Sequence, residues 1–310
     1  MNTPTHILLN ILLPEHSITR LSPDGARAQT ADGSDVTIWW FRTPQQAKTA
    51  LSALELLRGT QKIPALRAAD VTGTVSQRPA IVVDSPSGVP LGTIIDRLST
   101  TQQHAIGRQL GNIVADIHQH AVPSYGALHT PGYQNHKAQL QIRITEAITR
   151  LIDAQLLTSA TGDALNTLIA ATVTDDHTDA CLIHGARGPD SIWIDRSGTQ
   201  PAITTVTSWN SAFGGRPAAE HVRLADACAN DAYFALRIGY GEVYDERCQR
   251  PSDQLRERTL LPERLSWVLS KAAHAATHAQ PDEATRLLTI IQRWCDAIQQ
   301  SASATEEEYT

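Results

Sequence analysis

The stretch that most constrains the fold is Cys181-Leu-Ile-His-Gly-Ala-Arg-Gly-Pro-Asp-Ser-Ile-Trp-Ile-Asp195. Two short apolar runs flank a polar loop that contains two glycines and a proline. Short apolar runs bounded by turn residues are typical of buried strands, so the stretch predicts a strand, a loop and a second strand.

The composition narrows the possible classes of protein. A chain of 310 residues can form one large or two modest domains with a well-buried core. The formal net charge of −6 gives no basic patch, so we expect no nucleic-acid partner. The four cysteines lack metal-ligand spacing, which suits a reducing cytoplasm.

The apolar run Ile7–Leu13 is interrupted by Asn10 and follows no basic region, so we do not expect a signal peptide. No apolar run approaches the roughly 20 residues that span a bilayer, so we expect a cytoplasmic protein with no membrane partner.

Residues 1–85 predict a β-rich N-terminal lobe. A short helix is expected over residues 1–16, and a helix over Pro44–Gly59 that ends at the glycine. Strands are predicted at 16–21, 36–41 and 78–83, with a hairpin turn at Asp32-Gly33. The turn-rich segment Asp84–Pro90 is the predicted hinge between two lobes.

Residues 86–300 predict a larger helical lobe. Helices are expected at 100–120, 137–157, 162–173, 217–238, 260–279 and 282–301, with small strands between 181 and 207. The tail 301–310 is predicted to be disordered. The sequence therefore predicts an α+β protein with two lobes.

This order of elements resembles the aminoglycoside phosphotransferase and choline kinase family, the small-molecule branch of the protein-kinase-like fold. There the loop reads His-Gly-Asp, four residues, then Asn, and His184 and Gly185 retain its start. The run Leu110-Gly-Asn-Ile-Val-Ala-Asp-Ile-His118, followed by Tyr125-Gly126, is similar to the family's Leu-Gly, Leu-His and Tyr-Gly pattern. The resemblance covers residues 17–300 and implies a two-lobed kinase-like fold.

The resemblance also implies that the catalytic groups are missing. Ala186 stands at the position of the catalytic base, and Ser191 at that of the magnesium-binding Asn. Ser208 replaces the second metal-binding Asp, while Trp209 is retained beside it. Phosphoryl transfer depends on metal ions and a carboxylate that orients the attacking hydroxyl, and magnesium prefers anionic oxygens. We therefore expect neither a metal nor a cofactor.

The phosphate-anchoring groups are degenerate as well. Trp39 takes the position of the strand lysine, and Arg42 could replace it only in another register. Glu55 matches the lysine's partner, although a solvated helix carboxylate is the more ordinary interpretation. The span Leu21–Gly33, where a glycine-rich loop should lie, contains one early glycine.

Trp193 falls two residues past the Asn position, where the family has an apolar side chain on the floor of the adenine pocket. A tryptophan buries on the order of 200 Å², so Trp193 and Trp39 could fill the nucleotide pocket. The alternative is that both are ordinary core aromatics.

Two further patterns imitate functional motifs. Gly239-Tyr-Gly-Glu-Val-Tyr244 resembles a kinase glycine loop but follows a helix, so we interpret it as a helix-end turn. His274 and His278 have zinc-ligand spacing but no evident third ligand, which favours a solvated helix face.

The sequence thus predicts a pseudokinase that acts by binding a protein partner or a peptide substrate in a hetero-complex, as a scaffold or activating subunit. The resemblance implies, as one setting, bacterial complexes that dehydrate lanthipeptide-like or thioamide-bearing peptides. The rival hypothesis is a phosphotransferase with a non-standard site built from Asp190, Arg187 or Arg42, acting on a hydroxylated small molecule or on peptide Ser/Thr.

Overall fold

The computed structural model describes residues 16–22, 25–173, 179–185, 188–247, 253–278 and 280–307. The helix predicted at residues 1–16 lies outside this part of the chain, except for its last residue, which begins a strand. The chain forms two compact units, one from residues 1–132 and 179–250 and the other from 133–178 and 251–310. These units do not follow the predicted lobe boundary between residues 85 and 86.

The first unit begins with a five-stranded antiparallel sheet in the order β1-β2-β3-β5-β4. Its strands are β1 (His16–Ser22), β2 (Gly25–Thr30), β3 (Asp35–Trp40), β4 (Leu66–Asp70) and β5 (Ala80–Asp84). The predicted turn at Asp32-Gly33 is confirmed, because Gly33 has a φ of 83° and joins β2 to β3. Strand β4 was not predicted, since Leu66-Arg-Ala-Ala-Asp70 has no β-branched or aromatic residue.

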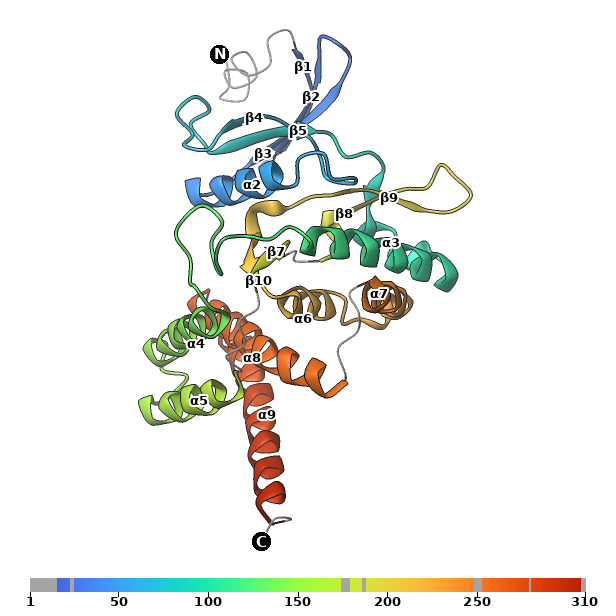
Figure 1. The fold of residues 1–310 in the computed structure, drawn as a ribbon. Helices are drawn as coiled ribbons and strands as arrows, with labels where there is room; N and C mark the ends of the chain where they lie inside the picture. Colours follow the sequence, from blue (N-terminus) through green and yellow to red (C-terminus); the bar gives the residue numbers. More distant parts are fainter. Residues whose placement is uncertain are drawn as a thin grey trace. The chain divides into compact units, whose positions relative to one another are not determined.

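Helix α2 (Pro44–Leu56) follows β3 and packs against β4, β5 and the later segment η4 (Trp209–Ser211). Figure 1 shows α2 between the sheet and the hairpin that includes β9 (Ala202–Val206). Thr43 caps its N-terminus by accepting the Gln46 backbone N–H, and the fixed φ of Pro44 suits the first turn. The predicted helix is therefore confirmed.

The two faces of the sheet bury different residues. Val36 and Ile38 of β3 pack with Val82 in an apolar cluster on one face. Successive side chains alternate across a strand, so Trp39 points to the opposite face, beside its register partner Ile81. Thr37 shares the face of Trp39, as does Arg27, its partner on β2. This second face carries the candidate site.

The rest of the first unit is helical, with two small sheets. The predicted hinge contributes β6 (Val89–Pro90), which pairs with β8. The following elements are η1 (Leu91–Thr93), η2 (Ile95–Arg97), α3 (Thr100–His118), β7 (Cys181–Ile183), η3 (Pro189–Ser191), β8 (Ile192–Asp195), β9 (Ala202–Val206), η4, β10 (Phe213–Gly215), α6 (Pro217–Ala227), η5 (Asp231–Tyr233) and α7 (Phe234–Arg247). The small sheets have the orders β6-β8-β9 and β10-β7.

Two predictions about residues 217–244 are wrong. The single helix expected over 217–238 is divided into α6 and α7, because the chain turns after Cys228 and Asn230 caps η5 through the backbone N–H of Ala232. The predicted helix-end turn at Gly239–Tyr244 lies inside α7. Gly239 is needed there because a Cβ would lie 2.2 Å from the His104 carbonyl oxygen of α3.

The second unit is a helical bundle of α4 (His136–Asp153), α5 (Ser159–Thr172), α8 (Asp253–Thr277) and α9 (Pro281–Glu307). Apolar residues from all four helices form its core, including Leu140, Leu165, Leu269 and Leu287. His136 and Glu263 form a buried pair with 2.7 Å between Nε2 and Oε1. Elsewhere in the bundle, His274 and His278 are both exposed, as predicted for a solvated face.

Helix α9 continues to Glu307, whereas residues 301–310 were predicted to be disordered. The segment Ser301–Thr305 has no glycine or proline to end the helix, which accounts for the difference. No helix in the described part of the chain combines the length and the apolar character that a membrane span needs. Together, the small antiparallel sheet and the large helical portion confirm the predicted α+β kinase-like fold.

Candidate functional site

The buried carboxylate of Glu220 holds the loop between β7 and β8 in place. Glu220 of α6 is 4% exposed, and its Oε2 accepts the backbone N–H groups of His184 at 2.7 Å and Gly185 at 3.1 Å. Gly185 has a φ of 67°, and a Cβ there would lie 2.4 Å from the carbonyl oxygen of Ser211. The loop therefore needs glycine at position 185 and an acceptor at position 220.

His184 ties the loop to the next strand. Its Nε2 lies 2.7 Å from the carbonyl oxygen of Thr207, so the neutral ring with hydrogen on Nε2 donates this bond. The fully buried Trp209 meets the ring edge-on, with centroids 4.2 Å apart. Burial lowers the pKa of His184, although the nearby Glu220 acts in the opposite direction. His184, Gly185 and Trp209 are thus held together by contacts around Glu220 and Thr207.

Ser191 and Ser208, the two described positions where the family resemblance implies metal ligands, carry hydroxyl groups. Ser191 is 5% exposed and donates its hydroxyl to the carbonyl oxygen of Gly188 at 2.8 Å, inside the loop. The Thr207 backbone N–H donates to the Ser191 carbonyl at 2.8 Å, which places Ser208 close by. Ser208 is exposed and left-handed, with a φ of 70°. Ala186 and Arg187 lie outside the described residues.

A small cavity of about 20 Å³ lies beneath this loop. Apolar residues of α3, including Leu110, Val114 and Ile117, line it together with His184, Ser191 and Glu220. This volume is enough for about one water molecule and far too small for a nucleotide. In the described part of the chain, no group of three or more His, Cys, Asp or Glu side chains is arranged to hold a metal ion.

A cation–π contact joins the five-stranded sheet to the β8–β9 hairpin, and we call the space between its two partners, Arg27 and Trp193, the slot. Arg27 of β2 places its guanidinium carbon 5.3 Å from the ring centroid of Trp193 on β8. An aromatic base inserted between two flat groups needs a gap of about 7 Å, because each contact takes about 3.5 Å. The gap between Arg27 and Trp193 is at most 5.3 Å, so a flat ring does not fit between these two side chains.

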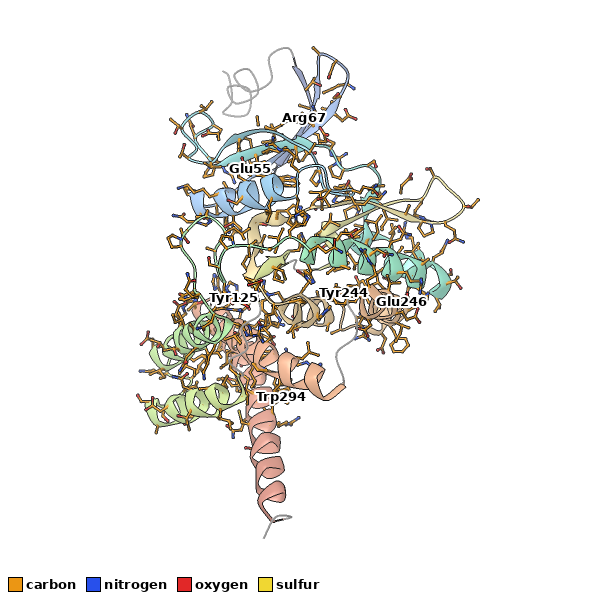
Figure 2. The ribbon with its side chains drawn as sticks, viewed as in Figure 1. Glu55, Arg67, Tyr125, Tyr244, Glu246 and Trp294 are labelled. Atoms are coloured by element: carbon orange, nitrogen blue, oxygen red, sulfur yellow. The ribbon has the colours of Figure 1, made fainter. Side chains whose placement is uncertain are left out.

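Of the remaining candidate residues, Glu55 and Arg42 lie outside this loop, and Asp190 lies within it but turns away from Ser191. Glu55 is exposed on α2 (Figure 2), as expected for a solvated carboxylate. Arg42 is exposed after β3, where its backbone N–H donates to the side chain of Gln46 at 3.1 Å. Asp190 is exposed, and its Oδ1 lies 2.2 Å from where a Cβ of Gly92 would be, which directs this carboxylate toward η1.

Sequence reasoning did not identify Glu220 or Arg27. The only sequence feature that could have indicated Glu220 is that this acidic residue lies on α6 among residues that are buried, such as Ala219 and Val222. The signal for Arg27 is a cationic residue in a strand whose alternate residues, Ala26 and Ala28, are small and buried. Neither pattern stands out without the fold, because acidic and basic residues at such positions usually face solvent.

Comparisons with known proteins agree on the fold. No protein-family model matches the sequence, and curated proteins give no significant sequence match. Solved structures of the small-molecule branch of the kinase-like fold do match over nearly the whole chain. A Ralstonia eutropha protein assigned to the aminoglycoside phosphotransferases gives a TM-score of 0.70 at 13% identity, covering 95% of this chain and 98% of that one.

Two ligand-bound structures are similar in the same way. The gentamicin complex of APH(2'')-IIa gives a TM-score of 0.64 at 12% identity, covering 94% of this chain and 96% of that chain. A thermostable mutant of aminoglycoside phosphotransferase APH(4)-Ia, in a ternary complex with ADP and hygromycin B, gives 0.61 at 14% identity, covering 95% and 97%. The chain therefore has the fold of the aminoglycoside phosphotransferases, as its sequence predicted.

Proposed function

We propose that this protein is a pseudokinase, a kinase-like chain that acts by binding and transfers no phosphate. It would serve as a scaffold or activating subunit for a protein partner or a peptide. A fold that has lost its catalytic groups can still offer a recognition surface, because function depends on the site and not on the fold.

The observation that supports the proposal is the contact between Arg27 and Trp193. The family resemblance implies that a nucleotide base would bind against Trp193, and there it would meet the guanidinium of Arg27. A cation–π contact contributes about 0.5–2 kcal/mol, so a ligand with strong interactions elsewhere could displace Arg27. ATP lacks that compensation here, because Ser191 and Ser208 provide neutral hydroxyls where magnesium needs anionic oxygens. The Arg27–Trp193 contact and the neutral hydroxyls of Ser191 and Ser208 would thus both disfavour the binding of Mg-ATP.

A stepwise restoration separates these two causes. The triple variant Ala186→Asp, Ser191→Asn, Ser208→Asp returns the catalytic base and the metal ligands but leaves Arg27 on Trp193. We expect this variant to neither bind nor hydrolyse Mg-ATP. Adding Arg27→Ala and Trp193→Leu to it should then produce magnesium-dependent nucleotide binding by calorimetry.

Each result of this series has a definite meaning. ATP hydrolysis by the triple variant alone would refute the filled slot, although the pseudokinase proposal would stand. Phosphoryl transfer by the unaltered chain to a hydroxylated small molecule or a peptide Ser/Thr would refute the pseudokinase proposal and favour the phosphotransferase alternative. Matched thermal melts of all variants identify any that have failed to fold.

We further propose that the binding partner is a protein or peptide in a hetero-complex, such as a bacterial complex that dehydrates peptide Ser and Thr with a separate lyase. A pseudokinase, as proposed here, can influence a reaction only through differential binding. Co-expression with the products of neighbouring genes, followed by size-exclusion chromatography, tests this. Co-elution with one such product supports the proposal, while elution apart from all of them, with stabilisation by a small molecule instead, overturns it.

A further inference from the structure

One face of α7 carries two large apolar residues that are exposed in the described part of the chain. Phe234 is 59% exposed and Ile238 is 45% exposed, four residues apart on the same helix face. Gly241, three residues further, continues this stripe, since positions i, i+4 and i+7 lie on one side of a helix. We call Phe234, Ile238 and Gly241 the α7 stripe.

Gly241 is the unusual member of the stripe. Glycine inside a helix costs about 1 kcal/mol relative to alanine, so it usually has a packing reason. Gly107 and Gly111 of α3 and Gly239 of α7 have such a reason, because a Cβ at each would lie 2.1, 2.7 and 2.2 Å from a backbone atom of the facing helix. At Gly241, nothing lies within 4 Å of the corresponding position.

Charges of opposite sign flank the stripe on its two sides. Arg237 lies on one side, with its guanidinium carbon 5.8 Å from the ring of Phe234. Glu242 lies on the other side, where its Oε2 contacts His104 at 3.0 Å and Arg108 at 3.1 Å on α3. Figure 1 shows α3 and α7 as neighbouring helices, in agreement with their contacts, so α3 flanks the Glu242 side of the stripe.

We propose that the α7 stripe is the contact surface for a second copy of this chain, with the two α7 helices parallel across a two-fold axis. In a heptad labelled a to g, Phe234, Ile238 and Gly241 occupy the core positions d, a and d. Arg237 is then the g position before Ile238, and Glu242 is the e position after Gly241. In a parallel pair, g of one helix meets the e of the other helix five residues later. Arg237 of each copy therefore meets Glu242 of the other.

The same arrangement explains the bare glycine. Two Gly241 residues facing each other allow close approach of the helix axes, and the two Ile238 side chains then meet one turn earlier. An antiparallel pair would place Arg237 opposite Arg237 on one side, which the charges disfavour. A contact confined to one helix per copy lies below the standard interface size of roughly 1,200–2,000 Å², so we expect a dissociation constant in the micromolar range.

Cysteine cross-linking tests the geometry directly. Gly241→Cys has room for its side chain, and in a parallel pair the two thiols face each other across the axis. Mild oxidation should therefore convert this variant to a covalent dimer, while the unaltered chain and the control Leu56→Cys stay monomeric on a non-reducing gel. Leu56 is a suitable control because it is an exposed hydrophobic residue, 39% accessible, on another helix of the same unit.

Sedimentation and light scattering over a micromolar concentration series test the energetics. The unaltered chain should dimerise reversibly, and Ile238→Asp should abolish the dimer while Leu56→Asp leaves it intact. Arg237→Glu and Glu242→Arg should each weaken dimerisation several-fold, and the double variant should dimerise as the unaltered chain does. Thermal melts identify any loss of fold from breaking the contacts of Glu242 with His104 and Arg108.

The outcomes are decisive. A chain that remains monomeric at every concentration, with Gly241→Cys not cross-linked, overturns the proposal. A dimer that forms without cross-linking through Gly241→Cys contradicts the parallel stripe. This inference does not depend on the proposed pseudokinase function, because the α7 stripe takes no part in the nucleotide slot.

Discussion

The substitution Glu220→Ala should destabilise the loop that carries His184. Glu220 is almost fully buried and accepts two backbone N–H groups, from His184 at 2.7 Å and Gly185 at 3.1 Å. Alanine leaves both donors buried without an acceptor, and each such group costs about 1–3 kcal/mol. We therefore expect a loss of about 2–6 kcal/mol, a large share of the 5–15 kcal/mol typical of a folded domain.

The conservative change Glu220→Gln keeps one oxygen acceptor in place, removes the charge and replaces the other oxygen with an NH2 group. It should cost less than half as much as the alanine change, since hydrogen bonds to a charged group are about twice as strong as neutral ones. Glu246→Ala is the control, because this glutamate is exposed near the end of α7 (Figure 2) and should change stability by at most about 0.5 kcal/mol.

Native-state hydrogen exchange is the appropriate assay, because it reports the opening of individual amides in a chain with two compact units. The amides of His184 and Gly185 should exchange much faster in Glu220→Ala, with an intermediate effect in Glu220→Gln. If these amides exchange at the same rate in Glu220→Ala as in the unaltered chain, Glu220 does not hold the loop and the reasoning is wrong.

Two further predictions concern stability. Burial and the neighbouring His221 lower the pKa of His118 to about 3, so the unfolded chain, with an ordinary histidine pKa of 6.5, takes up a proton first as the pH falls. Stability should therefore fall between pH 6.5 and 3, by about 2 kcal/mol at pH 5 from this group, and urea unfolding of His118→Gln should have a weaker pH dependence. Ser208→Gly should stabilise the chain by about 0.5 kcal/mol, since glycine relieves the left-handed φ of 70° but adds entropy to the unfolded state. A lower melting temperature for Ser208→Gly would contradict this assignment.

Patterns of local chemistry predicted most of the fold. The amphipathic spacing that predicted helices over 44–59 and 100–120 is confirmed by α2 and α3, and the Asp32-Gly33 turn joins β2 to β3. Strand β4 was missed because its residues, Leu66-Arg-Ala-Ala-Asp70, gain their strand conformation from pairing with β5 and not from their own preference. The division between α6 and α7 was missed because apolar spacing continues across the break.

The sequence alone could point to individual residues of the candidate site. It could not point to the contacts that these residues make in three dimensions. The resemblance to the family placed Ser191 by counting from His184-Gly185 and placed Ser208 beside Trp209. In the structure, Thr207 donates its backbone N–H to the Ser191 carbonyl. The closure of the slot by Arg27 required the register of β2 on β3, which places this arginine on the face of Trp39. That register depends on non-local pairing, which a sequence pattern does not reveal.

The proposed function depends most directly on one property, namely that this protein does not bind Mg-ATP. Isothermal titration of the unaltered chain with millimolar Mg-ATP, repeated with EDTA in place of magnesium, measures this directly. We predict no binding heat above dilution in either titration. Saturable heat that requires magnesium would contradict the claim, because it would mean that the chain assembles a metal site and opens the contact between Arg27 and Trp193.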